Sequence, residues 1–137
     1  MATLMTDEEI LAYKGDDYMN ADHLAFFRNK LEQMKAELLA NANATSQHLQ
    51  EQEATADPAD RATLEEEYAL ELRTRDRERK LLIKVEQAIR RIDDGEYGFC
   101  EDTGEPIGLG RLLARPTATL SLEAQERRER MKKQYAD

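Results

Sequence analysis

The stretch DHLAFFRNKLEQMKAELL, residues 22–39, carries the pattern that decides the fold. Its large apolar side chains recur at alternating steps of three and four residues, which is the period of a helix face that packs on another helix. They belong to Leu24, Phe27, Leu31, Met34 and Leu38, and a weaker stripe continues through Ala42, Thr45 and Leu49. Because Asn20 stands where such a helix needs an N-cap, the sequence predicts one long helix from Asn20 to about Glu53.

A second long helix is predicted after the short interruption ADPAD, residues 56–60. Asp57 is placed to cap it, Pro58 suits its first helical position, and neither Gly nor Pro follows before Gly95. We expect its packing seam to consist of Leu64, Tyr68, Leu72, Arg75, Arg79, Leu82, Val85, Ile89 and Ile92. Two such helices joined by a short turn must run antiparallel, so residues 20–94 are predicted to form a coiled coil of roughly 50 Å with its tip at residues 55–62.

Shorter segments on either side of the coiled coil are expected to form a small globular base. In residues 1–19, Thr6 and Glu9 have the spacing of a capping box, which predicts a short helix ending near Gly15. Residues 95–121, rich in Gly and Pro, are expected to form a zinc-finger-like region that we call the knuckle, and residues 122–137 predict a C-terminal helix. The predicted fold is therefore mainly α: a long antiparallel two-helix coiled coil on a base with a degenerate, metal-free zinc-finger-like knuckle.

The knuckle is called degenerate because it has the spacing of a zinc module without the ligands. Cys100 and Thr103 are spaced as in C-x2-C, and Ser121 and Ala124 repeat that spacing further along the chain. Zinc binds thiolate or imidazole, and Thr, Ser and Ala side chains supply neither. We expect the knuckle to keep its fold without metal.

Cys100 itself is open to two interpretations, as a redox sensor or as a structural residue. A redox sensor requires a thiol of low pKa, whereas Glu96, Glu101 and Asp102 are neighbours in sequence. Negative charge raises the pKa of a thiol, so the sequence favours a structural role for Cys100.

Charge and composition exclude several classes of function. The net charge of −9 disfavours binding to the phosphate backbone of nucleic acid, and direct sequence-specific binding to DNA is not expected. No apolar run approaches the ~20 residues that span a membrane, and the first residues lack the pattern of a secretory signal, so a cytoplasmic protein is expected. With no nucleophile–base pair, phosphate loop or dinucleotide motif, we expect no enzymatic activity.

Two charged features each have a structural and a functional interpretation. Asp57 and Asp60 can serve as cap and dipole partner of the second helix, and can also present carboxylates at the tip of a long rod. The basic run RTRDRERK, residues 73–80, can be a salt-bridged, solvated surface or a docking surface for a protein or a small polyanion.

Four stretches of the chain closely resemble the DksA family of bacterial RNA polymerase-binding transcription factors. They are DYMNADHLAFFRNKLEQMKAELL, DPADRATLEEEYALELRTRDRERKLLIKVEQAI, DDGEYGFCE and IGLGRLLARPTATL, and the likeness covers about Asp17 to Lys133. Family members that keep only one of the zinc cysteines form a zinc-independent branch, which this chain resembles in its knuckle.

The resemblance implies a function that spacing alone does not give. It implies that the chain binds bacterial RNA polymerase, inserts its coiled coil into the secondary channel, and acts with the nucleotide ppGpp. Such proteins destabilise open complexes at ribosomal RNA promoters and aid amino-acid biosynthesis promoters. The residues that match functional positions of the family are Asp57, Asp60 and Ala62 at the tip, Arg73 and Arg77 for polymerase docking, and Leu81, Lys84 and Arg115 for ppGpp.

The chain departs from the family at one pocket position, which is basic in the zinc-containing type and is Gln125 here, although Arg127 and Arg128 lie close in sequence. Two other classes stay open at this stage. Transcript-cleavage factors use a similar rod with an acid pair at its tip, but their sequences do not resemble this one. A coiled-coil adaptor would dimerise through its seams, whereas pairing within one chain predicts a monomer.

Overall fold

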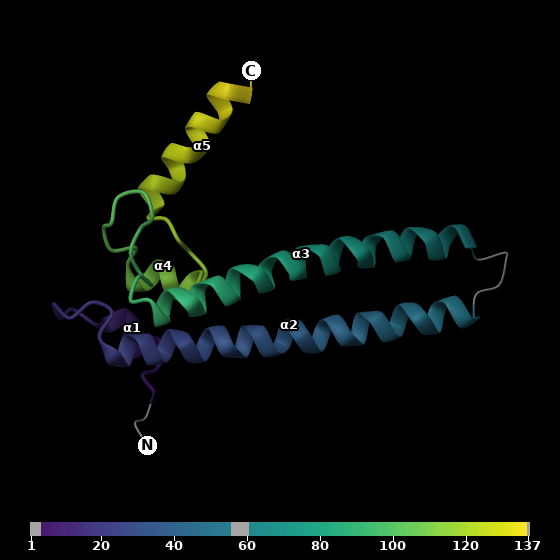
Figure 1. The fold of residues 1–137 in the computed structure, drawn as a ribbon, viewed down its shortest axis with the longest axis horizontal. Helices are drawn as coiled ribbons and strands as arrows, with labels where there is room; N and C mark the ends of the chain where they lie inside the picture. The colour runs from purple at the N-terminus through teal and green to yellow at the C-terminus, as the bar shows by residue number, and fades with distance from the viewer. Residues whose placement is uncertain (1–3, 56–60, 137) are drawn as a thin grey trace. The chain divides into compact units, whose positions relative to one another are not determined.

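The computed structural model describes residues 4–55 and 61–136, and these residues are mainly helical, as the sequence predicts (Figure 1). The helices are α1 (Asp7–Ala12), α2 (Ala21–Thr55), α3 (Arg61–Asp93), α4 (Leu109–Ala114) and α5 (Leu122–Ala136). The chain divides into two compact units, which we call the hairpin, residues 33–86, and the base, residues 1–32 with 87–137. The predicted tip residues Asp57 and Asp60 lie outside the described residues.

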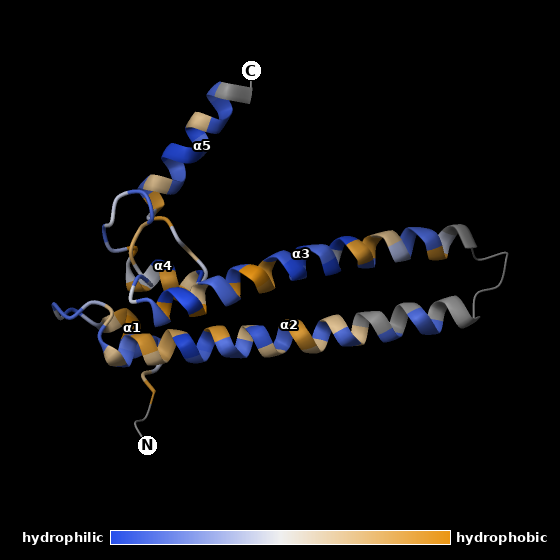
Figure 2. Ribbon diagram, in the orientation of Figure 1, coloured by the Kyte–Doolittle hydropathy of each residue, from blue (hydrophilic) through white to orange (hydrophobic). Residues whose placement is uncertain are grey.

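The hairpin consists of the adjoining parts of α2 and α3, which run antiparallel and pack together (Figure 1). The predicted seam of α3 is correct at its half-buried residues Leu64, Tyr68 and Leu82, but wrong between them. Leu72 is 41% exposed, whereas Glu71 and Glu78 are half-buried. Only a seam that passes through these two glutamates keeps the alternating three- and four-residue steps of a helix pair. Hydrophilic residues accordingly prevail in the middle of α3 (Figure 2).

Side-chain caps fix where the first two helices begin. The Thr6 hydroxyl accepts a hydrogen bond from the Glu9 backbone at 3.1 Å, and the Glu9 carboxylate accepts one from the Thr6 backbone at 3.3 Å. Asn20 caps α2, since its side-chain oxygen accepts from the backbone nitrogen of His23 at 2.9 Å. Helix α1 ends at Ala12, earlier than predicted, because Tyr13 turns into extended backbone and packs edge-on against the buried His23 ring.

The core of the base is assembled from both ends of the chain. Phe27 and Leu31 from α2 and Tyr97 from the knuckle are fully or almost fully buried. The other large apolar side chains buried in the base are those of Ile10, Phe26, Ile92, Ile107, Leu112 and Leu120. Helix α4, which the sequence did not predict, contributes Leu112 and packs against α1.

Tyr18 joins the N-terminal segment to the knuckle through its hydroxyl group. The hydroxyl donates to the carbonyl oxygen of Gly98 at 2.7 Å and accepts from the backbone nitrogen of Gly108 at 2.9 Å. Gly98 has φ = 93°, a backbone conformation that glycine adopts at little cost. A Cβ at this position would lie 2.7 Å from both Cγ and Sδ of Met19.

We therefore expect Gly98→Ala to lower the free energy of unfolding by about 2–4 kcal/mol, because strain at positive φ adds to the collision with Met19. Gly95→Ala is the matched control, since Gly95 also has positive φ but open space around its Cα. The control should lose only about 1–2 kcal/mol. Urea denaturation of both variants measures the difference, and equal losses would contradict the role of the Met19 contact.

Candidate functional site

The four positions with zinc-module spacing lie in two turns of the base, a first turn at residues 100–103 and a second turn at residues 121–124. The first turn is closed by the backbone nitrogen of Gly104, which donates to the carbonyl oxygen of Cys100 at 2.8 Å. In the second turn the Ser121 hydroxyl accepts from the backbone nitrogen of Ala124 at 3.2 Å and so caps α5. A backbone hydrogen bond of 2.9 Å from Glu101 to Thr119 holds the two segments together.

Cys100 is the centre of this arrangement. Its side chain is buried, at 3% exposed, and hydrogen-bond donors from both turns surround its sulfur. Burial acts to raise the pKa of the Cys100 thiol, but hydrogen bonds from the Thr103 hydroxyl and from the backbone of Ser121, Thr103 and Asp102 outweigh it and lower the pKa to about 6. The expectation of a raised pKa from acidic neighbours is therefore wrong. The neighbouring backbone N–H groups decide the pKa, because they stabilise the thiolate directly.

The stability of the base should depend on pH through this thiolate. A thiol whose pKa falls from 9.0 to about 6 on folding contributes stability that is complete above pH 9 and is lost as the pH falls towards 6. We expect wild type to lose stability relative to Cys100→Ser as the pH is lowered through this window. Urea denaturation of both proteins across the window measures the difference. Parallel stability curves for the two proteins would show that Cys100 does not titrate in this range.

The side chains at the four positions do not fit a zinc ion. Thr103 Oγ1 already accepts from the backbone nitrogen of Glu105 at 3.2 Å, Ser121 Oγ caps α5, and the fully buried Ala124 has no donor atom. Zinc needs four ligands of the thiolate, imidazole or carboxylate type. Within residues 4–55 and 61–136, no group of three or more His, Cys, Asp and Glu side chains is placed to hold a metal ion.

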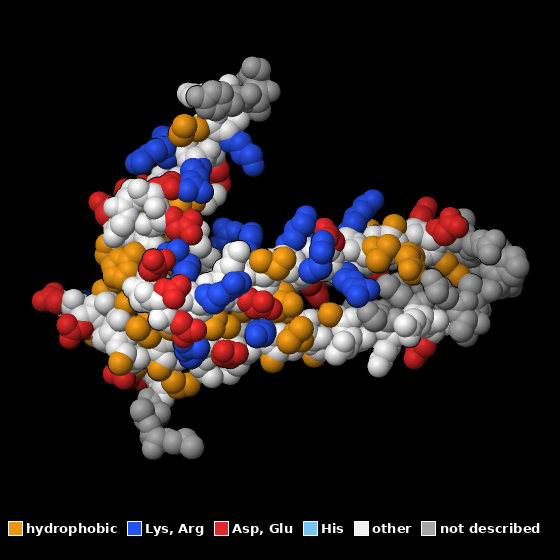
Figure 3. Space-filling view, viewed as in Figure 1, with side chains coloured by type: hydrophobic (Ala, Val, Ile, Leu, Met, Phe, Trp, Pro, Cys, Tyr) orange, Lys and Arg blue, Asp and Glu red, His pale blue; other side chains and the backbone are white. Residues whose placement is uncertain are grey.

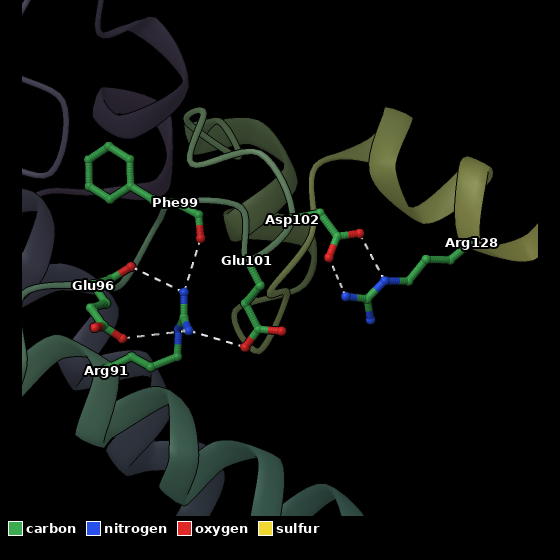
Figure 4. A network of polar contacts seen from close by, with 6 residues as sticks. All are labelled: Arg91, Glu96, Phe99, Glu101, Asp102 and Arg128. Carbon is green, nitrogen blue, oxygen red and sulfur yellow. Dashed lines mark hydrogen bonds and ion pairs between the residues drawn. The ribbon is translucent and has the colours of Figure 1, made fainter.

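Two arginines hold the first turn, as Figure 4 shows. Arg91, near the end of α3, donates to Glu101 Oε1 at 3.1 Å and to the carbonyl oxygens of Phe99 and Glu96 at 3.0 and 3.2 Å. Arg128 of α5 reaches Asp102 with two hydrogen bonds, of which the one from Nε to Oδ2 measures 2.9 Å. Neither set of contacts is predictable from the sequence, because the partners are not separated by the three- and four-residue steps of a helix.

The basic run of α3 is partly neutralised within the helix. Asp76 forms ion pairs with Arg79 at 2.8 Å and with Lys80 at 3.2 Å, and the hydrogen bonds from both lower the pKa of Asp76. Arg73 and Arg77, the predicted docking residues, are exposed. Lys and Arg side chains gather along α3 on the face of the molecule that Figure 3 shows.

The other matched positions are spread over both units of the chain. Ala62 lies in the first turn of α3, while the half-buried Leu81 and the exposed Lys84 lie further along the same helix, in the hairpin. Arg115 is exposed at the end of α4, in the base. Gln125 donates to Glu129 Oε1 at 3.1 Å along α5.

A helical hairpin carried by a base with a zinc-finger-type knuckle defines a class of small, mainly helical proteins. Two family models match the chain: "DnaK suppressor protein DksA, N-terminal domain" at residues 23–92, and "Prokaryotic dksA/traR C4-type zinc finger" at residues 95–130. The chain belongs to the DksA family. No helix in the part of the chain that the structure describes has the length and apolar character needed to cross a membrane.

Relatives and a solved structure support this assignment over nearly the whole chain. The chain is 52% identical to RNA polymerase-binding transcription factor DksA of Caulobacter vibrioides (strain NA1000 / CB15N), over 99% of this chain and 97% of the relative. It is 45% identical to the protein of the same name from Escherichia coli (strain K12), over 89% and 82% of the two chains. The structure of transcription factor DksA2 from Pseudomonas aeruginosa superposes with a TM-score of 0.86 at 43% identity, covering 93% of this chain and 99% of that one.

Proposed function

We propose that this protein is a non-enzymatic regulator of transcription that binds bacterial RNA polymerase. The observation that carries the proposal is the likeness to relatives named RNA polymerase-binding transcription factor DksA, which is 52% identity over 99% of the chain in one case. The likeness extends through the hairpin and the knuckle alike, since the two family models together span residues 23–92 and 95–130.

The hairpin is the part that we expect to enter the secondary channel of the polymerase. Residues 73–80 contain five basic and two acidic residues, so this short segment has a net charge of +3 within a chain of net charge −9. Exposed Arg73 and Arg77 in this segment are suited to dock on an acidic rim at the channel entrance. The predicted coiled coil of roughly 50 Å is long enough to place Asp57, Asp60 and Ala62 deep inside a channel.

The effector in this proposal is ppGpp, bound between the protein and the polymerase. Lys84 and Arg115 are exposed cations suited to its phosphates, and Leu81 supplies an apolar contact. With ppGpp, the protein would destabilise open complexes at ribosomal RNA promoters and aid amino-acid biosynthesis promoters. It acts as a cytoplasmic monomer without direct sequence-specific binding to DNA, and sizing at two concentrations tests the monomer.

Single-round transcription from a ribosomal RNA promoter with the cognate polymerase tests the function, with and without ppGpp. Wild type should reduce transcript yield, and ppGpp should deepen the reduction. Arg73→Ala combined with Arg77→Ala should weaken polymerase binding about fivefold or more, whereas Arg90→Ala, another exposed arginine of α3, should not. If wild type neither binds the polymerase nor changes transcript yield, the proposal is wrong.

We further propose that the knuckle folds without zinc, because its donor atoms are already engaged and do not fit the metal. A chelator should then leave the thermal melting curve of the purified protein unchanged, and the protein should contain far less than one zinc ion per chain. A melting temperature that falls on chelation, or a stoichiometric zinc content, would overturn this part of the proposal.

A further inference from the structure

In a zinc module the metal takes two ligands from each of two turns and so ties the turns together. In this chain the first turn, residues 100–103, must be attached to α5 by other means. One attachment is the backbone hydrogen bond of 2.9 Å from Glu101 to Thr119, just before α5, beside which the backbone of Ser121 approaches the Cys100 sulfur. The other runs between two side chains, from Asp102 in the first turn to Arg128, two helical turns into α5.

The Asp102–Arg128 pair has the geometry of a specific ionic clamp. Nε and Nη2 of the guanidinium each donate to a different oxygen of the carboxylate, which is the two-point arrangement that fixes direction as well as distance (Figure 4). The Asp102 side chain is 29% exposed and that of Arg128 is 53% exposed. The hydrogen bond from Arg128 lowers the pKa of Asp102, so the carboxylate keeps its charge to a more acidic pH than a free aspartate would.

Helix α5 depends on such a clamp because it has little apolar contact with the base. Ala124, near the start of α5, is fully buried, but residues 126–134 are all exposed. Polar helices of this length are marginal in water without tertiary support. Arg128 is therefore placed where a single contact decides how firmly the exposed part of α5 is held.

The same turn is also fixed to α3. Glu101, the residue before Asp102, pairs with Arg91 at 3.1 Å, and Arg91 donates to the Phe99 carbonyl oxygen at 3.0 Å. Adjacent carboxylates of the first turn thus bind arginines from two different helices, one at the end of α3 and one in α5. The turn therefore connects α3 to α5 through ionic contacts.

We propose that Asp102 and Arg128 are positioning residues that take over from the metal the task of holding α5 on the knuckle. The attachment of α5 then weakens as ionic strength rises, whereas in a zinc-bound knuckle it would weaken when the metal is removed. This inference rests on the proposal that the knuckle folds without zinc.

Amide hydrogen exchange of α5 tests the inference in the full-length protein. At low ionic strength, Asp102→Asn should speed exchange of residues 126–134 about three- to fivefold, while exchange in residues 22–31 of α2 should be unchanged. Wild type in salt on the order of 1 M should match the variant, because the Debye length, over which charges attract each other, falls to about 3 Å at that concentration. Arg130→Glu, a charge reversal at another exposed arginine of α5, is the matched control and should leave exchange near the wild-type rate.

A charge swap separates the ion pair from a general structural effect. Asp102→Arg with Arg128→Asp should restore slow exchange of α5, whereas each reversal alone should not. The Nε–H resonance of Arg128 should shift on Asp102→Asn in nuclear magnetic resonance spectra. Arg128→Gln removes the positive charge of the pair and should speed α5 exchange as Asp102→Asn does.

Each outcome has a defined meaning. Unchanged α5 exchange in both Asp102→Asn and Arg128→Gln overturns the inference, as does a swap that fails to restore protection. If a chelator speeds α5 exchange in wild type, the zinc-free knuckle is wrong, whatever the variants show. If the chelator has no effect and the variants have none either, only the role of the ion pair fails.

Discussion

Replacing Phe27 with alanine is expected to lower the free energy of unfolding of the base by about 3–5 kcal/mol. The ring is fully buried, packs edge-on against Phe26 with a centroid distance of 5.0 Å, and lies 5.7 Å from the ring of Tyr97. Removing it takes away apolar burial and leaves a cavity between elements from both ends of the chain. Because small domains are stable by only about 5–15 kcal/mol, this single change removes a large share of the total.

Chemical denaturation monitored by circular dichroism measures the loss. Leu39→Ala is the matched control on the same helix, since Leu39 is 45% exposed and should lose only about 0.5–1 kcal/mol. Similar losses for both variants would mean that the packing around Phe27 does not dominate the core of the base.

Asp60→Asn is expected to abolish regulation of transcription while leaving polymerase binding largely intact. Asparagine keeps the size of the side chain, removes its charge and replaces one acceptor oxygen with an NH2 donor. In the proposed mechanism that charge acts near the polymerase active site, while docking depends on the basic run of α3. The variant should therefore separate binding from regulation.

The test is single-round transcription combined with a competition assay for polymerase binding. Glu65→Gln is the matched control, because it too removes one negative charge; Glu65 itself is exposed early in α3, and the variant should regulate as wild type does. If Asp60→Asn loses polymerase affinity together with regulation, Asp60 belongs to the docking surface. Full regulation by the variant would remove Asp60 from the mechanism.

Local patterns were sufficient to predict most of the helices. The three- and four-residue steps placed Phe27 and Leu31 in the core, and side-chain chemistry identified Thr6 and Asn20 as caps. The predicted seam was wrong at Leu72, because an apolar side chain was chosen in place of Glu71, which continues the alternating three- and four-residue steps. Periodicity fixes which face of a helix is buried, so a polar residue in register is a better prediction than an apolar residue out of register.

The chemistry of the knuckle could not be predicted in the same way. The donors that lower the pKa of Cys100 come partly from Ser121, which the fold brings to the sulfur from a distant part of the chain. The Asp102–Arg128 pair joins residues separated by 26 positions. Such contacts depend on the path of the backbone between the partners, and a short window of sequence does not determine that path. The family resemblance suggested which positions are functional, but it does not contain the interactions that hold the knuckle together.

The base is built from residues 1–32 and 87–137, so its two halves lie on either side of the hairpin in the chain. Tyr18, for example, donates to Gly98 and accepts from Gly108, contacts that span 80 and 90 residues. A ribosome makes the chain from its N-terminus, so Phe27 can contact Phe26 early but lacks its contact with Tyr97 until that residue has emerged. Residues 33–86 form a compact unit of their own, so the two helices of the hairpin can pair before the base is complete. The apolar core residues within 1–32 therefore stay partly exposed during most of synthesis, and they are covered only when residues 87–137 have been made.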